Sequence, residues 1–227
     1  MKQYENYCKI SRKRFRNILP RDKSKKIIDI ACGGGHFLYF LQQEGYTNTE
    51  GIDISPEMIN FSRSIGIKNI KQSDLMRFLP KHKKSYDMII AHDIIEHLTK
   101  DEIVRFLELI HTALKSDGKV LIATINNQTL FGSRDRYIDF THETGFTALS
   151  LREILSACGF INIHIFGAKP VVYNLRSCIR AFLWNIVEKI LRLYTTIEIG
   201  IGWGIKNQKH IFENRIYATA RKPFKKK

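Results

Sequence analysis

The chain has 227 residues, 44% of them hydrophobic and 26% charged, with a formal net charge of +15 at pH 7. This composition is ordinary for a globular protein, and the length favours one α/β domain with an appendage. Four scattered cysteines without C-x-x-C spacing argue against a zinc site or a disulfide framework. Because neither an apolar leader nor a charge-free stretch of about 18 residues is found, we expect a cytoplasmic protein without a transmembrane helix.

The positive charge is concentrated at the two ends of the chain. Residues 1–26 carry a net +8, residues 27–169 carry −2, and residues 170–227 carry +9. We expect these units to be a basic N-terminal helical arm, a catalytic core, and a basic amphipathic helix with the final strand. Basic flanks favour phosphate-bearing partners, such as anionic lipid, nucleic acid or a phosphorylated carrier, and a solvated charge run without a partner explains them equally well.

Strand and helix patterns alternate along the chain. Short apolar or β-branched runs predict strands at 27–30, 50–54, 67–71, 86–91, 119–124, 160–166 and 215–220. Helices are predicted before Pro20, from the first glycine turn to about Gly45, from Ser55 onward, at 100–115 and at 150–158, with a loop over 126–144. This alternation implies a doubly wound sheet that binds ligands outside the carboxyl ends of its strands.

The stretch 27–38, IIDIACGGGHFL, combines a buried strand, a glycine turn and the start of a helix. Glycine permits positive φ and leaves no Cβ between the backbone and a ligand, so this unit is typical of a nucleoside or phosphate site. A dinucleotide fingerprint requires glycine where Leu38 stands, and the charge of Asp29 disfavours phosphate but suits an ammonium group. An amino-acid nucleoside with a positive sulfonium, S-adenosylmethionine, fits this pattern best.

Two further acids follow the next two predicted strands. Asp53 lies twenty residues after Gly33 and is placed to accept hydrogen bonds from two ribose hydroxyls. Asp74 follows the third strand, where it can accept a hydrogen bond from the exocyclic amine of adenine. Either acid alone is compatible with an ordinary turn residue, and together with the glycine turn they predict an adenosine site.

Four motifs in order, IIDIACGGGHF, EGIDISPEM, QSDL and YDMIIAHDIIEHL, resemble those of class I S-adenosylmethionine-dependent methyltransferases. The resemblance covers residues 25–166 and implies a Rossmann-like, mostly parallel seven-stranded sheet whose last strand is antiparallel. It also implies that Asp29, Gly33 and Gly35 hold the methionine part, Asp53 the ribose and Asp74 the adenine. The remaining predicted cofactor-binding residues are Ala31, Ile54, Leu75 and His92. Ala31 replaces the usual first glycine, and we expect it to tighten the approach to the cofactor without preventing binding.

Transfer of a methyl group to oxygen requires in-line alignment and a base for the hydroxyl proton. His97 follows the fourth strand, and His142 lies in the loop after the fifth, so both are expected at the same edge of the sheet. We predict them as catalytic bases with a slight preference for His142, and a structural histidine is the alternative for each. The other histidines have weaker positional claims.

A metal site is an alternative use of the same segment. If it is helical, Asp93, Glu96 and His97 share one face, and His142 adds a fourth ligand of a kind suited to Mg²⁺ or Mn²⁺. The pattern is similar to the E-x-x-E-H and distant His of small-RNA 2′-O-methyltransferases, and in its first part to ubiquinone-biosynthesis O-methyltransferases. The EHL segment also occurs in metal-free methyltransferases, so no metal is included in our prediction.

About 48 residues separate the last two predicted strands, and 175–194 within them form an amphipathic helix with apolar residues on one side and basic residues on the other. This helix packs on protein, either its own domain or a second subunit, or it lies at an anionic membrane surface. The two readings remain open, as does the oligomeric state. Membrane binding implies a peripheral location at the inner membrane face.

The segment RYIDFTHETGFTALSLREILSACGF, with the later IEIG, resembles a bacterial subgroup associated with lipopolysaccharide, O-antigen or capsule biosynthesis. That resemblance implies O-methylation of a sugar hydroxyl on a glycan or a lipid-linked glycan acceptor. The alternatives are a quinone precursor, an RNA terminus, or a non-catalytic cofactor-binding scaffold. We do not expect nucleic acid as a partner, because the chain lacks an aromatic-rich RNA module.

Overall fold

A computed structural model describes residues 1–199 and 210–224. Two parts of the predicted C-terminal unit, residues 200–209 and 225–227, lie outside the described residues. The first of them includes the final glycine of the IEIG segment. The strands form one sheet in the order β3-β2-β1-β4-β5-β7-β6. Their bounds are β1 Ile27–Ile30, β2 Thr49–Asp53, β3 Ile70–Gln72, β4 Tyr86–His92, β5 Leu114–Ile125, β6 Ile161–Gly167 and β7 Arg215–Arg221.

The sheet is parallel except for its last strand. β7 pairs antiparallel with β5 on one side and with β6 on the other, whereas the pairs among β1 to β5 are parallel. This topology confirms the predicted Rossmann-like, doubly wound seven-stranded sheet with an antiparallel last strand. It brings the carboxyl ends of β1, β2 and β4 together at one edge, where such folds bind ligands.

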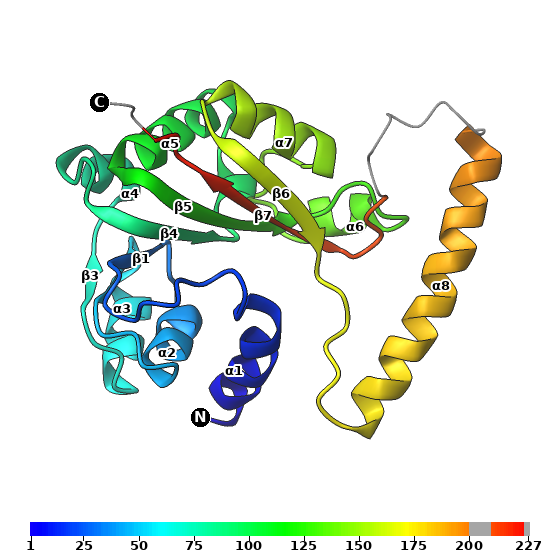
Figure 1. Cartoon of the computed structure of the whole chain (residues 1–227), viewed down its shortest axis with the longest axis horizontal. Helices are drawn as coiled ribbons and strands as arrows, with labels where there is room; N and C mark the ends of the chain where they lie inside the picture. The colour runs from blue at the N-terminus through cyan, green and yellow to red at the C-terminus, as the bar shows by residue number, and fades with distance from the viewer. Residues whose placement is uncertain (200–209, 225–227) are drawn as a thin grey trace.

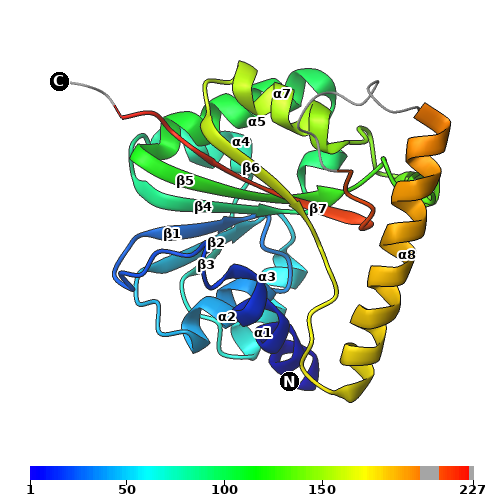
Figure 2. The ribbon, with the colours of Figure 1, turned by 45° about the vertical axis from the view of Figure 1, so that its right-hand side comes forward.

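Helices cover both faces of the sheet, and one further helix lies beside the domain (Figure 1). Figures 1 and 2 show α1, α2 and α3 on one face and α5 and α7 on the other. The helices are α1 Lys2–Phe15, α2 His36–Gln43, α3 Pro56–Ser64, α4 Leu75–Phe78, α5 Lys100–Ala113, α6 Gly132–Tyr137, α7 Ala148–Ala157 and α8 Leu175–Ile199, with 3₁₀ turns η1 Leu79–Lys81 and η2 Ile95–His97. No helix in the described part of the chain has both the length and the apolar character that a membrane span needs.

The first strand is fully buried because helices pack on both of its faces. Ile28 and Ile30 pack with α5 and α7 residues, whereas Ile27 packs with α1 and α2 residues. The predicted caps also form, since the Ser55 hydroxyl accepts a hydrogen bond from the backbone N–H of Met58 at the start of α3. These local signals explain why the predicted strand and helix order is observed.

Several element bounds differ from the prediction. β3 begins at Ile70 rather than 67, because Ile67 follows the glycine turn and packs in the core before the strand starts. α1 ends at Phe15, and α5 ends at Ala113, where β5 begins directly. The predicted loop 126–144 contains the short helix α6. These ends lie at turns, where local sequence patterns constrain the backbone least.

Candidate functional site

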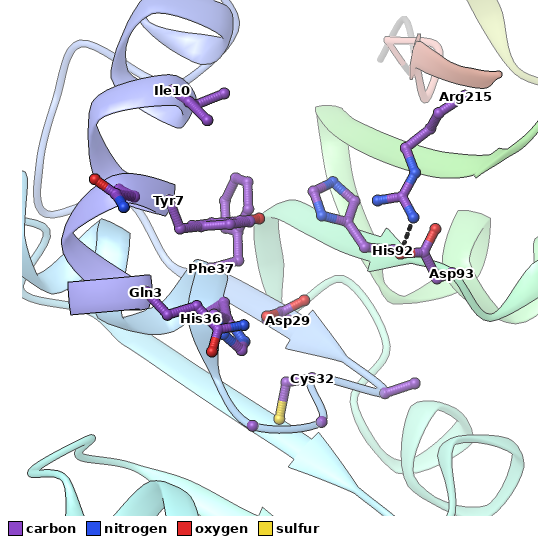
Figure 3. Close-up of a pocket in the computed structure, with 14 residues that line it drawn as sticks. Gln3, Tyr7, Ile10, Asp29, Cys32, His36, Phe37, His92, Asp93 and Arg215 are labelled. Carbon is purple, nitrogen blue, oxygen red and sulfur yellow. Dashed lines mark ion pairs between the residues drawn. The ribbon is translucent and has the colours of Figure 1, made fainter. Parts of the chain in front are cut away.

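A cavity of 620 Å³ opens at the carboxyl ends of β1 and β4 (Figure 3). Its walls come from the glycine turn, the end of β4, the first residue of β7 and one side of α1. The lining includes four of the predicted cofactor-binding residues, namely Asp29, Ala31, Gly33 and His92. A volume of this size is typical of small-molecule sites.

The glycine turn adopts left-handed backbone conformations at three positions. Ala31, Gly33 and Gly35 have φ of 53°, 49° and 72°. A Cβ built on Gly33 meets no atom within 4 Å, so this residue leaves open space at the cavity wall. Gly35 is the N-cap residue of α2, is buried, and does not line the cavity. Ala31 therefore adopts a backbone conformation that favours glycine. The sequence predicts only that the alanine side chain tightens the approach to the cofactor, and it does not indicate this conformation.

Asp29 is 3% exposed and is the buried acid of the cavity. Burial, together with the negative charge of Asp53, raises the pKa of Asp29 well above its usual range. A positive ligand group beside this carboxyl would restore its ionised form, because an opposite charge favours the charged state. Asp29 is therefore suited to an ammonium group, as the sequence predicts.

Asp53 connects the end of β2 to the glycine turn. Its Oδ2 accepts a hydrogen bond from the backbone N–H of Gly33 at 2.7 Å, and its Oδ1 accepts one from Ser55 at 2.9 Å. The next residue, Ile54, is 67% exposed, although it is a large apolar side chain that directly follows β2. An exposed apolar surface beside a carboxylate suits the face of an adenine ring next to its ribose.

Asp74 and Leu75 lie at the end of β3, outside the cavity lining. The Asp74 side chain caps α4 by accepting a hydrogen bond from Arg77 N–H at 2.9 Å. The ends of β2 and β3 are joined, because Ser73 N–H donates to the carbonyl of Asp53 at 2.9 Å. The structure thus places Asp53 next to the glycine turn, and all of the predicted adenosine residues lie outside the cavity lining.

The end of β4 supplies polar atoms without partners. The Nε2 of His92 and the Oδ1 of Asp93 are buried and accept or donate no hydrogen bond among the described residues. Burial lowers the pKa of His92 to about 3, with the charges of Arg215 and Arg14 adding to the shift, so the ring is neutral. Asp93 pairs through Oδ2 with Arg215 at 2.9 Å, as the dashed line in Figure 3 marks. Both unpaired atoms belong to residues that line the cavity.

His97 and His142 lie side by side, as their predicted positions required. Their ring centroids are 4.8 Å apart, and the Nδ1 of His97 is 2.8 Å from the hydroxyl oxygen of Thr141. The buried Glu96 lies beneath them and accepts a hydrogen bond from Thr124 at 3.0 Å. Burial raises the pKa of Glu96 to about 7, with the charge of Asp93 adding to the shift.

The four residues of the metal alternative are only partly brought together. Potential ligand atoms of Glu96, His97 and His142 lie within 4.8 Å of one another, whereas Asp93 is not part of this group. Asp93 has a φ of 52° and precedes the 3₁₀ turn η2, so the single helical face expected for 93–97 is not formed. Asp93 instead pairs with Arg215 and lines the cavity.

The N-terminal helix contributes to the site, although the sequence predicted only a basic arm. Gln3, Tyr7 and Ile10 of α1 line the cavity, and Figure 3 shows Gln3 beside His36 and Tyr7 beside Phe37. Tyr4 stacks on the ring of His36 with centroids 4.1 Å apart, which holds α1 against the start of α2. The spacing of Tyr4 and Tyr7 marks an aromatic side of this helix that could have indicated its contact with the core.

The cavity and the neighbouring end of β2 together fit an amino-acid nucleoside. Inside the cavity, the carboxyl of Asp29 and the unpaired Oδ1 of Asp93 can accept hydrogen bonds from an ammonium group. The unpaired Nε2 of His92 can donate one to a carboxylate, and Gly33 leaves open space. Asp53 and Ile54, outside the lining, offer partners for the nucleoside. The fold and this site define a class I S-adenosylmethionine-dependent methyltransferase. A family model described as a methyltransferase domain matches residues 2–165, and the chain belongs to that family.

Similar proteins agree with this assignment. The chain is 24% identical to a phosphoethanolamine N-methyltransferase of Plasmodium falciparum, over 92% of this chain and 83% of the relative. It is 28% identical to a ubiquinone biosynthesis O-methyltransferase of Klebsiella pneumoniae, over 45% of this chain and 43% of the relative, so less than half of that relative's length is matched.

Solved structures show the same fold. A methyltransferase of Archaeoglobus fulgidus superposes with a TM-score of 0.68 at 24% identity and covers 95% of this chain and 94% of its own. A Haemonchus contortus phosphoethanolamine N-methyltransferase, solved with S-adenosylhomocysteine, has a TM-score of 0.63 at 22% identity and covers 96% of this chain and 53% of its own. The chain is a methyltransferase that uses S-adenosylmethionine.

Proposed function

We propose that the chain is an O-methyltransferase that methylates a sugar hydroxyl of a glycan or of its lipid-linked precursor. The proposal of an oxygen acceptor rests on the pair His97 and His142. Their imidazole centroids lie 4.8 Å apart at the ligand-binding edge of the sheet. A hydroxyl becomes a competent nucleophile only as it loses its proton, and imidazole is the side chain best matched to that role near neutral pH.

When bound, S-adenosylmethionine supplies an electrophilic methyl group on a positive sulfonium. The chain contributes alignment, since Asp29 and the glycine turn fix one end of the ligand and Asp53 the other. One imidazole of the pair removes the acceptor proton, and the neighbouring Glu96 carboxyl, whose pKa of about 7 allows it to ionise, stabilises the imidazolium that results.

The sugar acceptor is supported by the resemblance of the segment around His142 to glycan methyltransferases. A quinone precursor is the second candidate, and the match to ubiquinone biosynthesis O-methyltransferases favours it. Both acceptors present a hydroxyl, so the histidine pair serves either reaction. Phosphoethanolamine, the amine named for the Plasmodium relative, is the contrasting acceptor.

The test measures single-turnover transfer from methyl-labelled S-adenosylmethionine to three acceptors in parallel. These are a lipid-linked glycan extract, a phenolic quinone precursor and phosphoethanolamine. We expect labelled glycan, and loss of at least 100-fold in rate in the double variant H97A/H142A, because general-base catalysis contributes about 10²–10⁴-fold. His164, an exposed strand histidine, provides the control variant H164A.

Labelling of phosphoethanolamine alone, or an undiminished rate in the double variant, would overturn the oxygen acceptor. Labelling of the phenolic compound alone would show that the acceptor is a quinone precursor and not a sugar. Cofactor binding without transfer to any acceptor would favour the scaffold function.

A further inference from the structure

Helix α8 packs on the domain through its polar side. Ser177 and Glu188 are its buried polar residues, and Trp184 Nε1 donates a hydrogen bond to Glu213 Oε1 at 3.1 Å. Glu188 also pairs with Lys169 at 2.8 Å and with Arg192 four residues along the helix. These contacts fix which side of α8 faces the protein.

The opposite side of α8 is apolar and exposed. Its members follow one another at intervals of three and four residues, so they form a single stripe along the helix. Each is between 43% and 75% exposed: Ile179, Phe182, Ile186, Ile190, Leu193 and Ile197. A surface helix of a globular protein normally has its apolar stripe towards the core. The predicted amphipathic helix is present, and the structure leaves the outer part of its apolar side exposed instead of packing it on the domain.

A second exposed apolar group lies beside α8. It surrounds α6, and each member is at least 63% exposed: Leu130, Phe131, Tyr137, Ile138 and Phe140. Phe131 and the α8 residues Ile179, Leu183 and Val187 line a common groove of 580 Å³. Figure 1 shows α6 on the side of the domain that faces α8. We call the α8 stripe and the α6 group together the apolar face.

Exposed cations border this face, and its exposed acids include Asp139 beside the α6 group and Glu198 on α8. Arg176, Arg180 and Lys189 lie on α8 and Arg134 lies on α6, all with exposed side chains. They add to a C-terminal unit of net charge +9, whereas the catalytic core carries −2. A second copy of the chain would bring an equally basic border against this one, and like charges disfavour that contact. An apolar centre with a basic border instead matches acyl chains beneath anionic head groups.

We propose that the apolar face docks on an anionic lipid bilayer. Docking would cover the α8 stripe and the α6 group, and it would place head-group phosphates near the bordering cations. The segment that carries the α6 group also carries His142, whose carbonyl accepts a hydrogen bond from Arg136. The site for a lipid-linked acceptor would thus lie beside the membrane, although the docking itself does not depend on which acceptor is methylated.

Vesicle flotation of the full chain tests this proposal. The probes are vesicles of phosphatidylcholine and of an equal mixture of phosphatidylcholine and phosphatidylglycerol, each at low and high salt. We expect flotation with the anionic vesicles that weakens at high salt, because salt screens the cationic border. The variant I186Q/I190Q should lose at least tenfold in partitioning. The control M58Q/V104Q alters two exposed apolar residues on α3 and α5 and should float like the parent chain.

Affinity for S-adenosylhomocysteine and the circular dichroism spectrum establish that each variant is folded, since no α8 residue lines the 620 Å³ cavity. Equal flotation with neutral vesicles, or none with anionic vesicles, would overturn the proposal. A dimer in analytical ultracentrifugation that I186Q/I190Q abolishes, without vesicle binding by the parent chain, would show that a second copy covers the face. Neither result would affect the methyl transfer test.

Discussion

Replacement of Asp29 by asparagine should stabilise the ligand-free protein and weaken its binding of cofactor. Asp29 is 3% exposed, and burial with the charge of Asp53 raises its pKa well above the usual range. Asparagine has nearly the same shape but never ionises. The substitution therefore removes a carboxyl that is unfavourable in the empty site and favourable beside an ammonium group.

The two effects have calculable directions and sizes. Because the folded pKa is raised, the stability from protonated Asp29 is present at low pH and is lost as pH rises through the folded pKa, at about 1.4 kcal/mol per pH unit. The variant's gain in stability over the parent protein should grow over the same pH range. In a chain of this size, each kcal/mol of that gain raises Tm by about 2–4 °C. Loss of a buried charge pair costs about 2–5 kcal/mol, which corresponds to roughly 30-fold or more in affinity for S-adenosylhomocysteine.

Thermal unfolding across a pH series and calorimetric titration with S-adenosylhomocysteine measure both effects. Asp87→Asn is the matched control, since Asp87 pairs with Lys115 at 2.6 Å and with Lys25 at 3.4 Å, far from the cavity lining. Burial acts to raise the pKa of Asp87, but the pairs with Lys115 and Lys25 and the backbone N–H of Lys26 outweigh it and lower the pKa. This variant should therefore lose stability and retain affinity. An unchanged affinity in Asp29→Asn, or a Tm advantage that shrinks as pH rises, would refute the reasoning.

Three other predictions follow from the same site. Ala31→Gly should leave the free energy of unfolding in urea equal or up to about 1.6 kcal/mol higher. The left-handed conformation costs alanine about 1–2 kcal/mol, and the greater entropy of the unfolded glycine chain offsets about 0.4–1 kcal/mol of the relief. A clear loss of stability would contradict the strain. Glu96→Gln removes an ionisation with a pKa of about 7, so the rise of kcat/KM with pH across neutrality should become shallower, and an identical profile would exclude Glu96 from the proton transfer. Chelator treatment should leave methyl transfer unchanged if the histidines act as bases. Activity that is lost and then restored by Mg²⁺ or Mn²⁺ would show a metal requirement, for which Glu96, His97 and His142 are the candidate ligands.

The parts of the site that come from one continuous segment were predictable from sequence. The strand, glycine turn and helix over 27–38 are determined by neighbouring residues, so Asp29 and Gly33 could be placed at the cavity in advance. His97 and His142 come from different loops, yet the rule for parallel strands brings both to one edge, and the structure has them 4.8 Å apart.

Features that depend on long-range packing were not predictable in the same way. The pairing of Asp93 with Arg215 joins residues more than 100 positions apart and depends on how β7 inserts beside β5. The amphipathic character of α8 was evident from periodicity, but periodicity does not say which side meets the protein. That choice is made by Glu188, Trp184 and their partners on the domain.

The cavity is assembled from both ends of the described chain. Gln3 and Tyr7 lie at its N-terminal side, and Arg215 enters from β7, which is inserted between β5 and β6. A nascent or proteolysed chain without β7 therefore lacks part of the site, even when the glycine turn has formed. Cofactor bound against Arg215 therefore favours the state in which β7 has joined the sheet, because a ligand that binds one state more tightly shifts the folding equilibrium towards it.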